Sequence, residues 1–307
     1  MGPPATTGLT RAPRFGKLLV EGEVARGPAS TVLAARLAGG DGQASATRLA
    51  VKAYDLALRV PSPDAARFEH AIDPRLARFR RADETGELPR DRLYKATDLV
   101  RGARPSLATV GSLRALVAFW AEVADAIGAA HAKGLSHGHV HPGHALVLDG
   151  ARPFVTDAAV VLTPQAARLH PESARFLAPE ALDELLADRP ACATPQADVY
   201  ALAASLLATL GAEPPVMELE ALREAKRRPR RPIIAAASIG RPVATRALAE
   251  VLAAALSPER DKRQLDGTAF AAELVRILQK KTDSVPVAAP LNGPPKPTGP
   301  TKQGETR

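Results

Sequence analysis

The sequence predicts an α+β protein in which a small β-rich part precedes a larger helical part. Between residues 16 and about 100 the chain has short apolar runs that are separated by Gly-rich or polar turns, a pattern typical of strands. From about 111 to 282 apolar residues instead recur at three- and four-residue spacing, which indicates amphipathic helices. This pattern changes only once along the chain. A cleft between two such parts is a common place for a ligand.

Short strands are expected in the first part of the chain, at residues 17–24, 30–38, 48–54 and 93–100. A helix is expected over 63–82, with a bend or break at Pro74 because proline has no amide hydrogen to donate. In the second part, two short strands are expected at 145–148 and 154–156. Helices are expected there at 111–133, 179–188, 195–211, 218–226, 243–256 and 266–280.

Composition limits the class of protein. The chain has 307 residues, of which 46% are hydrophobic, so it is long enough to bury a sizeable core. Its single cysteine, Cys192, excludes an internal disulfide framework and a cysteine-built zinc site, and it suits a reducing cytoplasm. The first residues lack the apolar run of a signal peptide, and the longest apolar stretch, 199–212, is too short to span a bilayer. We therefore expect a cytoplasmic protein.

The two ends of the chain and one internal stretch are polar or basic. Residues 1–15 are expected to be flexible, and residues 283–307 form a Pro-rich tail that is expected to be disordered. Within that tail PPKP, at 294–297, approximates a polyproline docking segment, although such tails are more often plain spacers. Part of the net charge of +8 lies in KRRPRRP at 226–232. No aromatic residues alternate with these charges, so a solvated loop is favoured over a nucleic-acid patch.

Four of the seven histidines lie close together in GLSHGHVHPGHALVLDG, at positions 137, 139, 141 and 144. In an extended segment alternate side chains share one face, so His137, His139 and His141 would form a row. Such a row is able to bind zinc or nickel. Metal binding is therefore one open interpretation of this segment.

A second candidate site lies in the β-rich part. The small residues ARGPASTV, at 25–32, are expected to form a loop between two strands, where backbone amides approach phosphate oxygens. Lys52 lies in the apolar strand sequence AVKAY, from which its ammonium would reach the same phosphates. On their own these residues are weak evidence, because a strand lysine often only protects a sheet edge.

Several segments, in order along the chain, resemble the motifs of eukaryotic-type protein kinases in the style of the bacterial serine/threonine kinases. HGHVHPGH, at 137–144, resembles the catalytic loop, and DAA, at 157–159, resembles the metal-binding Asp-Phe-Gly. APE, at 178–180, looks like the Ala-Pro-Glu of the family, and Arg263 lies where the family places the arginine that pairs with that glutamate. The resemblance covers about residues 16–280.

The resemblance implies a bilobal kinase-like fold with an N-lobe over 16–98, a C-lobe over 99–282 and a hinge at about 98–102. It implies a gatekeeper at Thr97 and the binding of ATP with magnesium. The nucleotide-binding residues that it implies are Gly27, Val32, Lys52, Asp98, Val100 and Asp157, of which Asp157 would also hold the metal. The structural residues that it implies are His137, Glu180, Asp198 and Arg263, with Asp198 at the start of the buried central helix.

This sequence departs from the family at the positions that carry the chemistry. The catalytic Asp of the family is His139 here, which removes a fixed negative charge from the position of the general base. Its magnesium-binding Asn is His144, and a ring nitrogen is a poor ligand for a hard cation. Its loop Arg and Lys are Gly138 and His141. Losing a general base typically costs roughly 10²–10⁴ in rate.

Two more departures concern the phosphate-binding loop and the partner of Lys52. In the loop, Ala25 and Ser30 replace the outer glycines and Pro28 removes one amide donor. The glutamate that should pair with Lys52 would be Glu69, or it is absent and Ala71 occupies its position.

We therefore expect a pseudokinase that acts as a nucleotide-sensing or scaffolding module, with ATP and magnesium bound weakly and a protein as its partner. The alternative is an unconventional active serine/threonine kinase in which His139 or water replaces the base. The minor alternative is a metal- or nucleic-acid-binding protein on the kinase frame.

Overall fold

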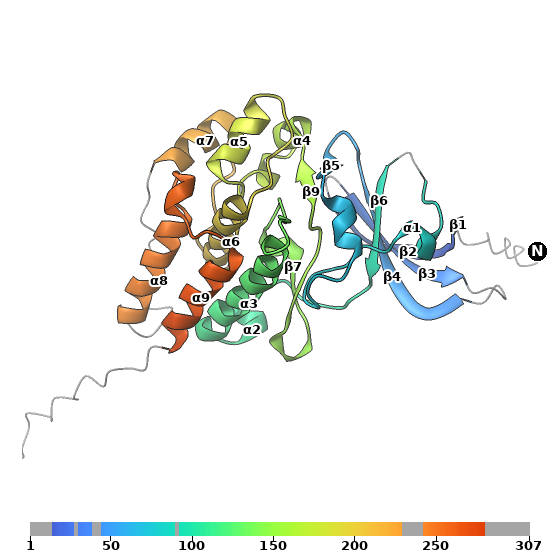
Figure 1. The fold of residues 1–307 in the computed structure, drawn as a ribbon, viewed down its shortest axis with the longest axis horizontal. Helices are drawn as coiled ribbons and strands as arrows, with labels where there is room; N and C mark the ends of the chain where they lie inside the picture. The colour runs from blue at the N-terminus through green and yellow to red at the C-terminus, as the bar shows by residue number, and fades with distance from the viewer. Residues whose placement is uncertain (1–13, 28–29, 39–43, 90–91, 229–241, 280–307) are drawn as a thin grey trace, which may run out of the picture.

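The computed structural model describes residues 14–27, 30–38, 44–89, 92–228 and 242–279. It has an α+β architecture in which an antiparallel sheet and a larger helical part lie side by side (Figure 1). The expected order, strands first and helices afterwards, is confirmed at this level. The expectations for the first 13 residues and for 283–307 fall outside the described residues. Of the described helices, none combines the length and apolar character that crossing a membrane requires.

The sheet contains the four expected strands and one shorter strand. Every strand is antiparallel to its neighbour, in the order β1-β2-β3-β4-β6. Gly27 pairs with Ser30, so β2 and β3 form a tight hairpin. Leu18, Leu49 and Val51 are fully buried in the core of the sheet. The strands are Arg14–Phe15 (β1), Leu18–Gly27 (β2), Ser30–Ala38 (β3), Ala44–Tyr54 (β4) and Leu93–Asp98 (β6).

The segment between β4 and β6 differs from the helix that was predicted over 63–82. It contains a short strand, Arg59–Pro61 (β5), a 3₁₀ turn, Ala65–Glu69 (η1), and a four-residue helix, Ala82–Thr85 (α1). Residues 70–81 are not helical. The prediction of a long helix here was therefore wrong.

Pairing with another strand explains why no helix forms in this segment. The amide of Val155 donates to the carbonyl of Arg75 at 2.7 Å, and the amide of Ala77 donates to the carbonyl of Val155 at 2.8 Å. Backbone groups that are used in this way are not available for the i to i−4 bonds of a helix. Phe68 and Phe79 are both buried, with ring centroids 6.4 Å apart. The apolar residues of this segment are spaced as in a helix, but they are buried by a chain that is not helical over residues 70–81.

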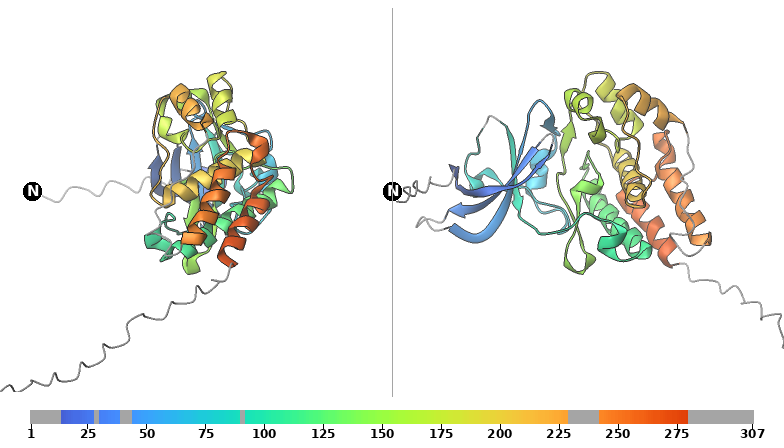
Figure 2. Two further views of the ribbon diagram at one scale, coloured as in Figure 1. Left: turned by 90° about the vertical axis from the view of Figure 1, so that its left-hand side faces the viewer. Right: turned by 180° about the vertical axis from the view of Figure 1, so that it is seen from behind.

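α3 and α6 supply many of the buried residues of the main core cluster, to which α8 and α9 also contribute. Figure 2 shows the arrangement of the helices from two further sides. α6 is buried on nearly all sides, as its apolar sequence predicted. All six expected helices are present, and the short helices α2 and α4 were not predicted. The helices are Leu107–Val110 (α2), Leu113–His131 (α3), Pro164–Leu169 (α4), Pro179–Leu186 (α5), Pro195–Thr209 (α6), Leu219–Arg227 (α7), Pro242–Ala255 (α8) and Gly267–Gln279 (α9).

A close helix contact joins α3 to the start of α9 through two glycines. A Cβ atom on Gly267 would lie 2.3 Å from the carbonyl oxygen of Ala124, and one on Gly128 would lie 2.4 Å from the amide nitrogen of Thr268. The amide of Gly267 also donates to Nδ1 of His131 at 3.0 Å. The two backbones thus approach more closely than any side chain at these positions would allow.

Replacing Gly128 with Ala is expected to lower the free energy of unfolding by ~1–3 kcal/mol, because the added methyl group meets backbone atoms of α9 that have no room to move. Alanine improves helix propensity by ~1 kcal/mol, which offsets part of this loss. Urea denaturation measures the change. The matched control is Gly27→Ala, where the nearest atom would be 3.8 Å from the new Cβ. Equal stability of the two variants would contradict the expectation.

Candidate functional site

The histidine-rich segment forms a loop that leads into two short paired strands, as expected. The strands are Ala145–Val147 (β7) and Pro153–Val155 (β8), which are antiparallel, and a 3₁₀ turn, Pro142–His144 (η2), precedes them. Asp157 lies two residues after the end of β8, and strand Val160–Leu162 (β9) comes next. The loop and these strands lie between the sheet and the helices of the second part (Figure 1).

Asp198, at the start of α6, holds the first part of the loop in place. Its carboxylate accepts hydrogen bonds from the amide of His137 at 2.7 Å, the amide of Gly138 at 2.9 Å and Nε2 of His131 at 3.0 Å. The Asp198 side chain is almost completely buried. Buried polar groups need such partners, so Asp198 is a structural residue that orients the loop.

His137 and Gly138 also have structural positions. Nε2 of His137 donates to the carbonyl of Thr156 at 2.9 Å, and its Nδ1 accepts from the amide of His139 at 3.3 Å. Burial lowers the pKa of His137 to about 4, so the ring is neutral near pH 7. Gly138 has φ +81°, and a Cβ there would lie 2.9 Å from a side-chain carbon of Val161. No arginine fits at position 138.

The carboxylate of Asp157 accepts from three donors of the protein. Lys52 and Nε2 of His144 both contact Oδ2, the latter at 2.9 Å, and the hydroxyl of Tyr54 donates to Oδ1 at 2.6 Å. The Lys52 and His144 donors hold the pKa of Asp157 well below its usual range despite its burial. The expected neighbours Lys52, His144 and Asp157 therefore do meet, but they bind one another.

Both nitrogens of the His144 ring face acceptors. Nδ1 lies 2.8 Å from the carbonyl oxygen of His139, and Nε2 lies against the Asp157 carboxylate. The His144 ring is thus held between the Asp157 carboxylate and the backbone of the loop.

His139 is buried as deeply as His137. It is only 1% exposed, and its Nε2 donates to the carbonyl of Ser173 at 3.0 Å. Its Nδ1 is buried and has no hydrogen-bond partner among the described residues. Burial, the Arg59 guanidinium and the other histidines lower the pKa of His139 well below its usual value.

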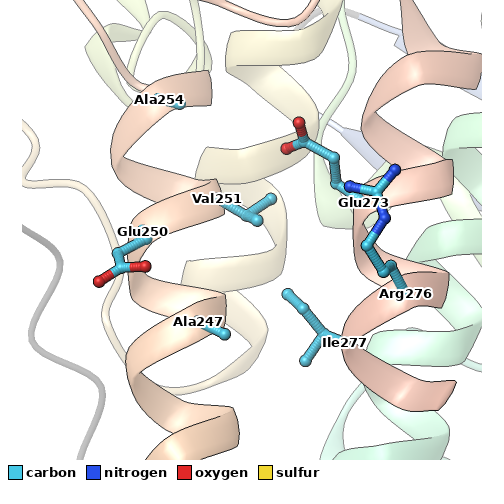
Figure 3. A pocket seen from close by; sticks show the side chains of 7 residues that line it. All are labelled: Ala247, Glu250, Val251, Ala254, Glu273, Arg276 and Ile277. Carbon is cyan, nitrogen blue, oxygen red and sulfur yellow. The ribbon is translucent and has the colours of Figure 1, made fainter. Parts of the chain in front are cut away.

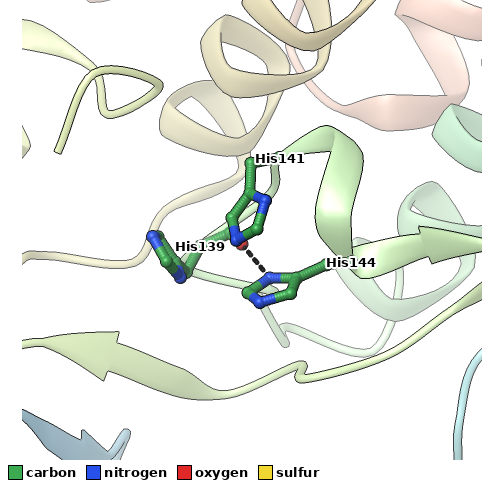
Figure 4. Close-up of side chains that lie close together, drawn as sticks. All are labelled: His139, His141 and His144. Atoms are coloured by element: carbon green, nitrogen blue, oxygen red, sulfur yellow. Dashed lines mark hydrogen bonds between the residues drawn. The ribbon is translucent and has the colours of Figure 1, made fainter. Parts of the chain in front are cut away.

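His141 lies beside His144, with ring centroids 3.6 Å apart (Figure 4). Its Nδ1 accepts a hydrogen bond from the amide of Gly143 at 3.0 Å. Burial and the neighbouring His144 and His139 lower its pKa well below the usual value. His139, His141 and His144 thus form one cluster of rings, whereas the expected row of His137, His139 and His141 does not form as a metal site.

Glu180 and Arg263 pair as expected. Two guanidinium nitrogens of Arg263 donate to the two carboxylate oxygens of Glu180 at 2.7 and 2.8 Å. The Arg263 side chain is fully buried and also stacks over the Tyr200 ring, 5.1 Å from its centroid. A bidentate pair of this kind fixes the start of α5 against the residues before α9.

The other predicted nucleotide-binding residues lie along the sheet and the segment that follows it. Val32 pairs directly with Lys52 across β3 and β4. Gly27 ends β2, and neither its φ angle nor its surroundings require glycine. Asp98 is exposed and its side chain pairs with Arg80, while Val100 is partly buried just after β6.

Neither candidate for the glutamate partner of Lys52 fills that role. Glu69 lies at the end of the η1 turn, and Ala71 is exposed. The carboxylate that pairs with Lys52 is Asp157. Of the two alternatives, the absence of a Lys–Glu pair is the one that the described residues show.

Sequence reasoning missed Tyr54 and Arg59. Tyr54 lies two residues after Lys52 on the same strand face, and this period-two spacing was the available signal. Arg59 is buried in β5, and burial lowers its pKa to about 10. β5 pairs with β9, a contact between distant segments that no local pattern predicts.

The basic stretch at 226–232 is only partly described, and Lys226 is not a solvated residue. Its ammonium donates to the carbonyls of Arg175 and Leu177, the first at 2.7 Å, and lies 4.8 Å from the centroid of the Tyr200 ring. Burial lowers the pKa of Lys226 to about 7. Residues 229–232 lie outside the described residues.

A separate open groove of about 320 Å³ lies between α8 and α9 (Figure 3). Val251 and Ile277 form part of its apolar lining, and Glu273 and Arg276 contribute charges. None of the residues predicted from the sequence to bind a ligand lines this groove. It is a different place from the histidine cluster.

No protein-family model matches this chain, and the comparison with curated proteins returned no match.

Proposed function

We propose that this chain is a kinase-like protein without phosphotransferase activity that works as a regulatory binding module. The observation that carries the proposal is the state of position 139, where the resemblance expects the catalytic carboxylate. His139 is buried there and donates to the carbonyl of Ser173. A general base has to lie within hydrogen-bond reach of the substrate hydroxyl. A ring in this environment does not meet that requirement.

The arrangement of the motifs supports the kinase-like assignment. A five-stranded antiparallel sheet precedes the helical part, and Lys52 on the sheet meets Asp157 from the second part. Ala159 stands where the resemblance expects the glycine of Asp-Phe-Gly, and its φ of +57° lies in the region that favours glycine. Glu180 and Arg263 form the pair that the resemblance implies.

The site does not fit magnesium. Magnesium prefers oxygen ligands in octahedral geometry, but His144 offers nitrogen at the position of the second ligand. Both oxygens of Asp157 already accept from Lys52, His144 and Tyr54. A magnesium–nucleotide complex would have to break these contacts first, so we expect ATP with magnesium to bind weakly.

Two features of the backbone also oppose catalysis. Between β5 and β6 the only regular helices among the described residues are the short η1 and α1, so no long helix carries a glutamate to Lys52. In addition, β5 pairs with β9 through residues 59–61 and 160–162. This pairing ties the segment after Asp157 to the strand region that carries Lys52. The β5–β9 pairing therefore favours a fixed, structural role for the segment after Asp157, not one in which that segment opens to admit a substrate.

Phosphate transfer from ATP tests the proposal. The purified chain is incubated with labelled ATP and generic protein substrates, with magnesium and then with manganese, beside Asp157→Asn. We expect the wild type and the variant to give the same background incorporation into substrate and into the chain itself. Incorporation by the wild type that Asp157→Asn abolishes would overturn the proposal and would favour an unconventional active kinase.

Nucleotide binding is measured separately as a thermal shift with ATP, with and without magnesium. The chain is compared with Lys52→Met, which removes the ammonium but keeps a side chain of similar length. A wild-type shift that the variant loses identifies a nucleotide-sensing module. The same unfolding temperature with and without ATP identifies a scaffold that acts through its surface alone.

A further inference from the structure

Three histidines of the loop bring ring nitrogens together in the interior. Each of His139, His141 and His144 has a ring nitrogen that lies within 4.8 Å of one on each of the other two. Their ring centroids are 3.6 to 5.1 Å apart, and Figure 4 shows the three rings side by side. Asp157 adds a carboxylate oxygen 2.9 Å from Nε2 of His144.

His139 supplies a lone pair that has no partner. Because its Nε2 donates to Ser173, the neutral ring leaves Nδ1 as an acceptor, and this atom is buried without a hydrogen-bond donor among the described residues. An unsatisfied buried polar atom is costly, by ~1–3 kcal/mol. A metal ion would satisfy it.

The hydrogen bond at Nδ1 of His144 orients the ring so that Nε2 is placed to bind a metal. Nδ1 donates to the carbonyl of His139, which fixes the orientation of the ring, and metal-binding histidines commonly have such an outer contact. Nε2 then shares a hydrogen with Oδ2 of Asp157, and the two atoms are 2.9 Å apart. Two ligands at about 2.0–2.1 Å from zinc in tetrahedral geometry lie about 3.3 Å apart. Nε2 of His144 and Oδ2 of Asp157 would therefore have to move only slightly apart to hold a zinc ion between them.

His141 is the more adaptable member of the cluster. Its Nδ1 accepts from the amide of Gly143, so Nε2 carries the hydrogen of the neutral ring. Coordination through Nε2 requires that hydrogen to move to Nδ1, which gives up the bond from Gly143. His141 is partly exposed and lies in a short turn, so it is the ligand that rearranges.

We propose that this cluster binds a zinc ion or a similar transition-metal ion through ring nitrogens of His139, His141 and His144, with the Asp157 carboxylate, beside Nε2 of His144, as the fourth ligand. The metal takes the place of the hydrogen between His144 and Asp157, and that proton passes to solvent. The charge of the site therefore rises by only one unit. Three imidazoles and one carboxylate suit zinc and exclude magnesium. The inference depends on the geometry of the cluster and not on the proposed function.

Titration of the metal-free chain with zinc chloride, followed by calorimetry, tests the site. We expect one zinc ion per chain with micromolar or tighter affinity, a higher unfolding temperature and the visible absorption of a tetrahedral complex when cobalt replaces zinc. Zinc stabilises the fold only if it prefers the folded chain. Magnesium at the same concentrations should have no effect.

Two variants and one control locate the ion. His144→Asn and His141→Phe should each weaken zinc binding about 10–100-fold, the effect that is typical of losing a ligand or its support. Far-ultraviolet circular dichroism establishes that each variant is folded, and His141→Phe, at a partly exposed position, serves if His144→Asn unfolds. His70→Asn changes an exposed histidine outside the cluster and should leave zinc binding unchanged.

Three results would overturn the inference. The first is the absence of zinc binding below millimolar concentration. The second is unchanged affinity in a folded cluster variant, and the third is an equal loss of affinity in His70→Asn. The kinase assay does not bear on any of them, so the two proposals succeed or fail separately.

Discussion

Replacing Asp198 with Ala is expected to lower the free energy of unfolding by ~3–5 kcal/mol, because it breaks a buried pair and its hydrogen bonds. The carboxylate accepts from His131 and from the amides of His137 and Gly138, all of them in the interior. Alanine leaves these donors without an acceptor, and a buried donor without a partner costs ~1–3 kcal/mol. Urea denaturation at neutral pH measures the loss.

The matched control is Asp261→Ala, which removes an exposed carboxylate near the surface turn before Arg263. Its effect should stay within about 0.5 kcal/mol. If Asp198→Ala does not fold, Asp198→Asn keeps one acceptor oxygen and should show a smaller loss. A result in which Asp198→Ala equals the surface control would mean that the loop does not depend on this carboxylate.

Acid is expected to destabilise the metal-free chain between about pH 6.5 and pH 4, by about 3 kcal/mol from His137 alone. The folded-state pKa of His137 is about 4, below the unfolded value of about 6.5. The unfolded chain therefore binds more protons in this window. The contribution is fully present above the unfolded value and is lost as the pH falls toward the folded value.

His139 and His141 add to the loss with the same sign, because burial lowers the pKa of each well below its usual value. Urea denaturation over a series of pH values, with a chelator present, measures the slope. His137→Gln keeps a donor for the Thr156 carbonyl and should flatten the slope by up to one proton, whereas His70→Asn should leave it unchanged. A stability that is independent of pH across this window would show that the buried rings take up protons without unfolding.

The strands and helices follow from local sequence because their signals are local. β2, β3, β4 and β6 match the apolar runs that predicted them, and α6 matches its continuous apolar stretch. The caps are local as well, since the hydroxyl of Thr194 accepts from the amide of Ala197 at the start of α6. These strands and helices form where the secondary-structure propensity of the residues and the spacing of the apolar residues favour the same element.

The segment at 63–82 shows where that reasoning fails. Its apolar spacing fits a helix, but Arg75 and Ala77 pair with Val155, a residue far away in sequence. The same limit applies to the candidate site, because Tyr54 and His144 reach Asp157 only through the fold. The spacing of apolar residues indicates which side chains are buried, but it does not indicate which backbone groups form hydrogen bonds with each other.

The sequence alone determined that this is an α+β chain with strands first and helices afterwards, and that four histidines crowd into positions 137–144. Only the tertiary structure decided what those histidines do. Asp157 receives three donors from different elements, and His139 is buried with one unpaired nitrogen. Protonation state and ligand capacity depend on burial and on partners within a few ångströms, and the folded chain sets both.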